Sequence, residues 1–88
     1  MKSVRVKAIG VPYRQGWIEV AQVHPGFINI ETWDVHPDVD ISAVSLDGIA
    51  DRNVTANTEI ELNVEEAKKL ADALLKVIED ASRQANQA

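Results

Sequence analysis

The sequence predicts an α+β domain in which a four- to five-stranded, mainly antiparallel sheet packs on one C-terminal helix. Short stretches that alternate apolar and polar residues fill most of residues 3–62, which is typical of strands. The connections between them are mostly too short for helical crossovers, so neighbouring strands should be antiparallel. The last third carries apolar residues at helical spacing. With 88 residues, the chain has room for one domain and a modest core.

The expected strands are residues 3–9, 17–23, 27–33, 41–46 and 58–62. In the first, Val4 and Val6 alternate with Arg5 and Lys7, so one face is apolar and the other basic. The second and third are β-rich and are separated by the turn-forming sequence His24-Pro25-Gly26, which predicts a hairpin.

The helix is expected over about residues 64–83. Asn63 can cap it, and Glu66 three positions later completes the spacing of a capping box. The apolar positions at three- and four-residue steps are Ala67, Leu70, Ala71, Leu74, Val77, Ile78 and Ala81. No Gly or Pro interrupts them. Residues 84–88 lack bulky apolar side chains and are expected to fray.

One helix can cover only one face of the sheet, which makes the other face a candidate binding surface. The face expected under the helix carries Ile18, Val20, Ile28 and Ile30. Trp17, Phe27 and Trp33 would then lie on the uncovered face, where aromatic side chains suggest contact with another copy or a different protein. The alternatives are a loop (10–16 or 47–57) folded over them, or a register shift that places Trp33 in the core.

The net charge of −5 conceals a strongly acidic middle segment. Residues 1–14 carry four cations and no acid, whereas residues 15–66 carry eleven acids against Arg52 alone. The N-terminal cations are expected to pair with these acids. An acidic chain is a poor ligand for nucleic-acid phosphates, so no direct nucleic-acid binding is expected. A basic protein partner is favoured instead, because complementary charge steers association.

The most acidic stretch is residues 34–40. If it were extended, alternate side chains would share one side, namely Asp34, His36, Asp38 and Asp40. Such oxygen-rich ligands suit calcium, magnesium or manganese. The alternatives are an acidic recognition surface, or a solvated edge whose charges block sheet pairing. No metal or cofactor is therefore assigned.

Motifs of known catalytic chemistry are absent from the sequence. It has no Cys, no glycine-rich phosphate loop, no nucleophile elbow and no HExxH motif. His24 and His36 are the only imidazoles available as general bases. Glu19 and Glu31 are expected to face each other across neighbouring strands, which could form a carboxylate pair. We therefore expect a protein that is not an enzyme.

One resemblance involves the segment Glu61-Leu62-Asn63-Val64-Glu65-Glu66-Ala67 with Leu70-Ala71 and Leu74-Leu75 after it. It resembles the strand, cap and helix that end many small uncharacterised actinobacterial and phage-encoded proteins. The resemblance covers about a third of the chain and carries over no functional residue. It implies a short sheet packed on a C-terminal helix, and an accessory, mobile-element type of protein.

These observations lead to one main functional hypothesis and two alternatives. The main hypothesis is a small acidic protein-interaction domain, which forms a homodimer and binds a protein partner, for instance as a phage-type inhibitor of a host protein. Its expected binding residues are Trp17, Phe27, Trp33, Glu31, Asp34, Asp38 and Asp40. The alternatives are a metal- or small-molecule-binding domain or small enzyme that uses His24 and His36, and a structural subunit of a phage or secretion assembly. No membrane-spanning segment is expected. The expected location is the cytoplasm.

Overall fold

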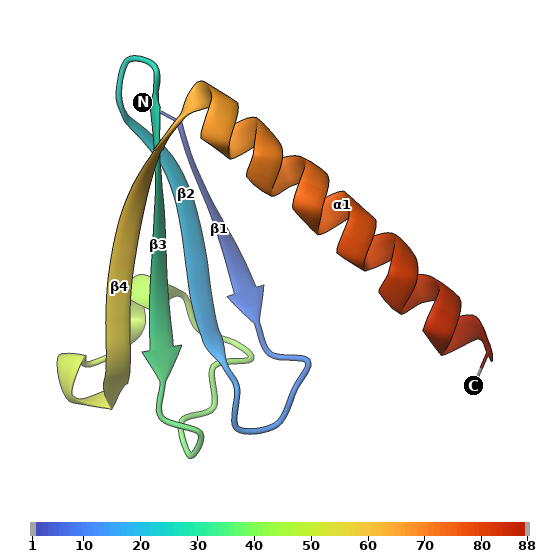
Figure 1. Ribbon diagram of the computed structural model, residues 1–88. Coiled ribbons are helices and arrows are strands. Elements are labelled where there is room, and N and C mark those ends of the chain that lie inside the picture. The colour runs from blue at the N-terminus through green and yellow to red at the C-terminus, as the bar shows by residue number, and fades with distance from the viewer. Residues whose placement is uncertain (1, 88) are drawn as a thin grey trace.

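Residues 2–87, which the computed structural model describes, form one antiparallel sheet of four strands followed by a long helix (Figure 1). The elements are β1 (Ser3–Ala8), β2 (Gly16–His24), β3 (Phe27–Val35), β4 (Val54–Asn63) and α1 (Val64–Gln87). The strands lie in chain order, β1-β2-β3-β4, and each neighbouring pair is antiparallel. The predicted α+β class, with a sheet packed against one C-terminal helix, is confirmed.

The strand predicted at residues 41–46 does not form. Residues 36–53 instead make a loop that contains two short 3₁₀ turns, Leu46–Gly48 and Asp51–Asn53. Pro37 has no amide hydrogen for a ladder, and the Asp40 carboxylate accepts a hydrogen bond from the Ser42 amide at 2.9 Å. Such local bonds compete with strand pairing. The last strand is longer than predicted, because β4 begins at Val54.

Cross-strand pairing separates the two faces of the sheet along the predicted alternation. Val6 pairs with Ile18, and Ile30 lies between Val20 and Ile60. We call this side the open face, and its apolar residues are Val4, Val6, Ile18, Val20, Ile28, Ile30, Ile60 and Leu62. The opposite side, which includes Trp17 and Trp33, is the loop-covered face.

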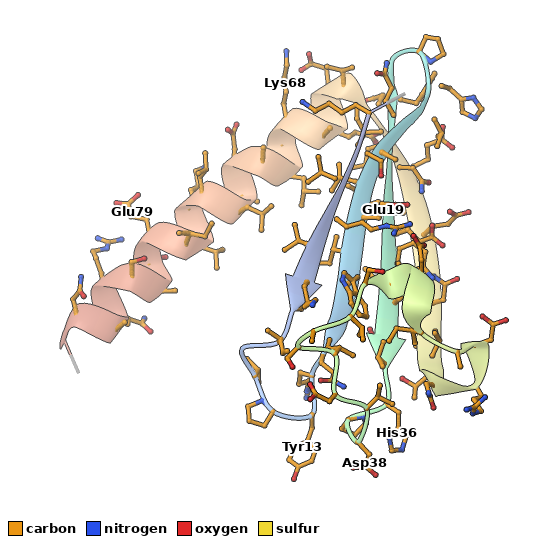
Figure 2. All side chains as sticks on the ribbon, turned by 180° about the vertical axis from the view of Figure 1, so that it is seen from behind. Tyr13, Glu19, His36, Asp38, Lys68 and Glu79 are labelled. Atoms are coloured by element: carbon orange, nitrogen blue, oxygen red, sulfur yellow. The ribbon has the colours of Figure 1, made fainter. Side chains whose placement is uncertain are left out.

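The core lies between the loop-covered face and the loop 36–53, which crosses the strands on that side (Figure 2). It contains Trp17, Val35, Ile41 and Leu46, and Ile41 is completely buried. Trp33 is partly buried against this cluster. The prediction that the tryptophans lie on an uncovered face is therefore wrong. A loop covers them, as the alternative proposed, but it is the loop 36–53.

Helix α1 follows β4 without an intervening residue. The predicted capping box forms, because the Asn63 side chain accepts from the Glu66 amide at 2.8 Å and the Glu66 carboxylate accepts from the Asn63 amide at 3.0 Å. The helix packs against β3 and β4 near its start and then diverges from the sheet (Figure 1). It continues to Gln87, beyond the predicted end at about residue 83 and through most of the 84–88 tail that was expected to fray; residue 88 lies outside the described residues.

Candidate interaction surfaces

Most of the open face is an apolar surface that the rest of the chain leaves uncovered, although Ile28, Ile30 and Leu62 are half-buried. Val6 on β1 and Ile60 on β4 are 53% and 63% exposed, and Ile18 and Val20 between them are each more than a third exposed. The prediction that these central residues lie beneath the helix is therefore wrong, because α1 leaves the sheet near its own N-terminal end. A contiguous exposed apolar surface makes this face a candidate for contact with another macromolecule.

Beyond the start of the helix, the apolar side of α1 is uncovered as well. We call it the α1 stripe, and its residues are Val64, Ala67, Leu70, Ala71, Leu74, Leu75, Val77, Ile78 and Ala81. Leu74 and Ile78 are each more than half exposed, and Ala67 is the one partly buried residue among the described side chains of the helix. The predicted amphipathic pattern is present, but the sheet of this chain packs only against the start of the helix.

Carboxylates form a row across the strands on the loop-covered face. Glu19, Glu31 and Glu59 are direct neighbours on β2, β3 and β4, so the predicted apposition of Glu19 and Glu31 is confirmed and extended. We call these three residues the acid row. Arg5 on β1 lies 2.7 Å from Glu19. Among residues 2–86, no Lys or Arg side chain forms an ion pair with Glu31 or Glu59.

Amide side chains hold the other two members of the acid row. Asn57 donates to the Glu31 carboxylate at 3.1 Å, and Asn29 donates to the Glu59 carboxylate at 3.3 Å. Neutral donors satisfy these oxygens but leave their charge unbalanced. Glu59 was not singled out from the sequence, because the long connection between β3 and β4 gives no local cue to their register.

Cations on β1 tie the loop 36–53 to the sheet. Arg5 bridges Glu19 and Asp47 of the loop, at 2.7 and 3.2 Å, and these hydrogen bonds raise the pKa of its guanidinium. Lys7 donates to the Ser42 carbonyl at 3.3 Å, and its ammonium group lies 5.7 Å from the centre of the Trp17 ring. The expected pairing of the N-terminal cations with the acidic middle is thus confirmed for Arg5.

The acidic stretch 34–40 does not gather its side chains on one side. Strand β3 ends at Val35, and a turn follows in which the Val39 amide donates to the His36 carbonyl at 3.0 Å. Asp38 donates its amide to Nδ1 of His36 at 3.1 Å, so the two side chains lie near each other in this turn (Figure 2). Gln15 fixes the turn through a hydrogen bond of 2.9 Å to the His36 carbonyl.

Asp40 is engaged within the loop rather than in a metal site. Its carboxylate accepts from the hydroxyl and the amide of Ser42, and these hydrogen bonds lower its pKa. Asp34 lies at the exposed end of β3. Within residues 2–87, no group of three or more His, Asp or Glu side chains is arranged to hold a metal ion. The prediction that Asp34, His36, Asp38 and Asp40 line one side is wrong, because the chain turns after Val35.

The two histidines lie at opposite ends of β3. His24 is at the β2–β3 turn, opposite Phe27, and its Nε2 lies 3.9 Å from the Glu61 carboxylate. His36 follows the other end of the strand. The predicted interface residue Phe27 is 46% exposed at that turn, separate from Trp17 and Trp33. Within one chain, the histidines therefore form no common site.

A shallow groove of about 380 Å³ lies where β2 begins. Tyr13, Trp33, Asp34 and Thr55 contribute to its walls. Gly16 is required there, because a Cβ at that position would lie 1.8 Å from the Trp33 carbonyl oxygen. Neither histidine lines this groove.

In the described part of the chain, no helix combines the length and the apolar character needed to cross a bilayer. Comparisons with protein-family models, with curated proteins and with solved structures found no match for this chain.

Proposed function

We propose that this protein is a non-enzymatic protein-interaction domain. The observation that carries the proposal is the simultaneous exposure of two aliphatic surfaces, the open face and the α1 stripe, in one small chain. Ile60, Leu74 and Ile78 are each more than half exposed. Folded proteins rarely leave apolar surfaces of this extent in water unless another macromolecule covers them.

The acid row supports a second, basic protein partner on the opposite side of the sheet. Like charges on directly opposed cross-strand residues destabilise a sheet, and Glu31 lies between Glu19 and Glu59. A cationic partner would relieve that repulsion and would be attracted over distance by the acidic surface. This is the form of the hypothesis in which an acidic inhibitor occupies a basic cleft of its target.

The experiment that tests this function is affinity capture from a bacterial lysate, with washes at low salt and at about 0.5 M salt, where charge interactions are screened within a few Å. The decisive variant is Glu31→Gln with Glu59→Gln. Its matched control, Glu65→Gln with Glu79→Gln, removes the same charge from the polar side of α1. We expect the wild-type chain to capture a basic protein that the high-salt wash releases. The control variant should still capture this protein, and the acid-row variant should not.

Recovery of the bait alone would contradict a basic partner, as would binding that neither salt nor the acid-row variant changes. The metal- or small-molecule-binding alternative predicts a raised thermal midpoint in the presence of metals or metabolites. A structural subunit of a larger assembly would use the same apolar surfaces but would form open, growing complexes rather than one of fixed size.

A further inference from the structure

We propose that a second copy of this chain covers the open face, with the α1 stripe of each copy lying on the open face of the other. The inference rests on the proposed interaction function and names the partner of its apolar surfaces. Four independent features of the chain lead to this arrangement: the β4–α1 junction, the excess surface, the shape of the two surfaces and the placement of charge.

The junction between β4 and α1 disfavours a helix that folds back along its own sheet. No residue separates Asn63, the last of β4, from Val64, the first of α1. Strand-to-helix connections that return a helix across its own sheet commonly use two to six residues, so this one is about two residues too short. The reciprocal hydrogen bonds between Asn63 and Glu66 fix the first turn of the helix directly at the end of the strand. A hinge without slack favours exchange of the element between copies.

The exposed surface exceeds that of a compact monomer by the amount a dimer would bury. The chain exposes 6786 Å², whereas a compact protein of 9.7 kDa exposes about 5,100 Å². Two chains that each buried the excess of roughly 1,700 Å² would hide about 3,400 Å², within the range of obligate homodimers. The radius of gyration, 15.0 Å, likewise exceeds the value of about 12 Å for a compact chain of this length.

The two surfaces match in length and chemistry. A helix of 24 residues is about 36 Å long, and strands of nine or ten residues are about 30 Å long, so α1 can cross the whole open face of a partner. Both surfaces are aliphatic, which suits close packing without buried charge. A two-fold axis requires that one chain carry both complementary halves, and this chain does.

Charge placement is consistent with the same arrangement. The Lys and Glu side chains of α1, such as Lys76 and Glu79, lie on the side of the helix opposite the α1 stripe and would stay in water. The acid row is on the other face of the sheet, so the helix of the partner copy would not cover it. The dimer would therefore present two acid rows, one on each outer side, to basic partners.

The first test measures the mass of the full chain by size-exclusion chromatography with light scattering. At micromolar concentration we expect twice the 9.7 kDa chain mass. Ile60→Glu and Leu74→Glu should each raise the dissociation constant at least about a hundredfold, because each buries an unpaired charge in the interface. The matched control Lys76→Glu, on the polar side of α1, should remain a dimer. A monomeric wild-type chain would overturn the inference.

The second test locates the contact without relying on a disruptive charge. The native chain has no Cys, so a chain carrying Val20→Cys can be refolded with a tagged chain carrying Leu74→Cys and treated with a short bismaleimide. If each copy places its α1 on the open face of the other, the reaction should give a cross-linked product that contains one chain of each kind. The control pair, Val20→Cys with Lys76→Cys, should yield little of it. A dimer without the first product, or with equal amounts from both pairs, would overturn the exchanged arrangement.

Failure of this inference can be told from failure of the proposed function. A monomeric wild-type chain that still captures a protein, and loses it on Ile60→Glu, overturns exchange and leaves an interaction domain. A cross-linked dimer that captures nothing supports the exchange of α1 between copies and contradicts the proposed basic partner.

Discussion

Replacing Ile41 by Ala should open the loop 36–53 and cost a large part of the stability. Ile41 is fully buried and lies in the centre of the small core with Trp17, Val35 and Leu46. Truncation of a buried Ile to Ala costs about 2–5 kcal/mol, from lost transfer energy and the cavity left behind. Domains of this length are stable by only about 4–13 kcal/mol. We therefore expect a loss of about 3 kcal/mol.

Apolar packing, rather than the ionic ties, should dominate this effect. The Arg5–Asp47 contact is exposed, with 79% of the Asp47 side chain accessible, and such pairs are worth less than about 1 kcal/mol. Without Ile41 they cannot hold the loop alone. Trp17, which is 4% exposed in the native fold, should then become accessible to water.

The assay is urea denaturation followed by tryptophan fluorescence at one fixed protein concentration, because the proposed dimer would make the apparent stability depend on concentration. The matched control is Val44→Ala, at a 39% exposed position in the same loop, where we expect a change of less than about 0.5 kcal/mol. A cost below about 1 kcal/mol for Ile41→Ala, or one equal to that of the control, would refute the reasoning that this core holds the loop on the sheet.

Three further predictions concern the backbone, the helix start and pH. Gly16→Ala should lower the free energy of unfolding by at least about 2 kcal/mol in urea denaturation, because its Cβ would meet the Trp33 carbonyl oxygen; an unchanged midpoint would contradict this. Asn63→Ala should cost about 1 kcal/mol through loss of the cap, measured by the same titration, with Asn86→Ala as a control expected to be neutral. Because hydrogen bonds from Ser42 lower the pKa of Asp40, its carboxylate stabilises the fold above about pH 4, and that contribution is lost as the pH falls through the folded-state pKa. Asp40→Asn should therefore flatten the fall of the thermal midpoint between about pH 5 and pH 3, and an unaltered slope would count against it.

Local patterns in the sequence were enough to predict the class of fold, the division of the sheet and the start of the helix. Alternation with a period of two requires Ile18 and Val20 to lie opposite Trp17, whatever the tertiary context. The capping box depends on residues three positions apart, so Asn63 and Glu66 suffice to predict it. The apposition of Glu19 and Glu31 follows from a short hairpin, whose turn limits the register.

What covers each face was decided only by tertiary structure. Alternation says that Trp17 and Ile18 point opposite ways, but it does not say which side receives a loop or a helix. That outcome depends on Ile41 and Leu46 reaching the Trp17 side from a connection that bends at Pro37, a contact made across more than twenty positions of the chain.

The direction of α1 could not be predicted from the sequence pattern either. The apolar spacing predicts which side of the helix seeks a partner, yet any apolar surface satisfies that demand, in the same chain or in another. The exit angle from β4, held by the cap at Asn63, sends the helix away from its own sheet (Figure 1). The sequence by itself determined the surfaces of this protein, whereas the tertiary structure decided that one face is closed by a loop and the other is left open, because long-range packing and junction geometry are not encoded in local periodicity.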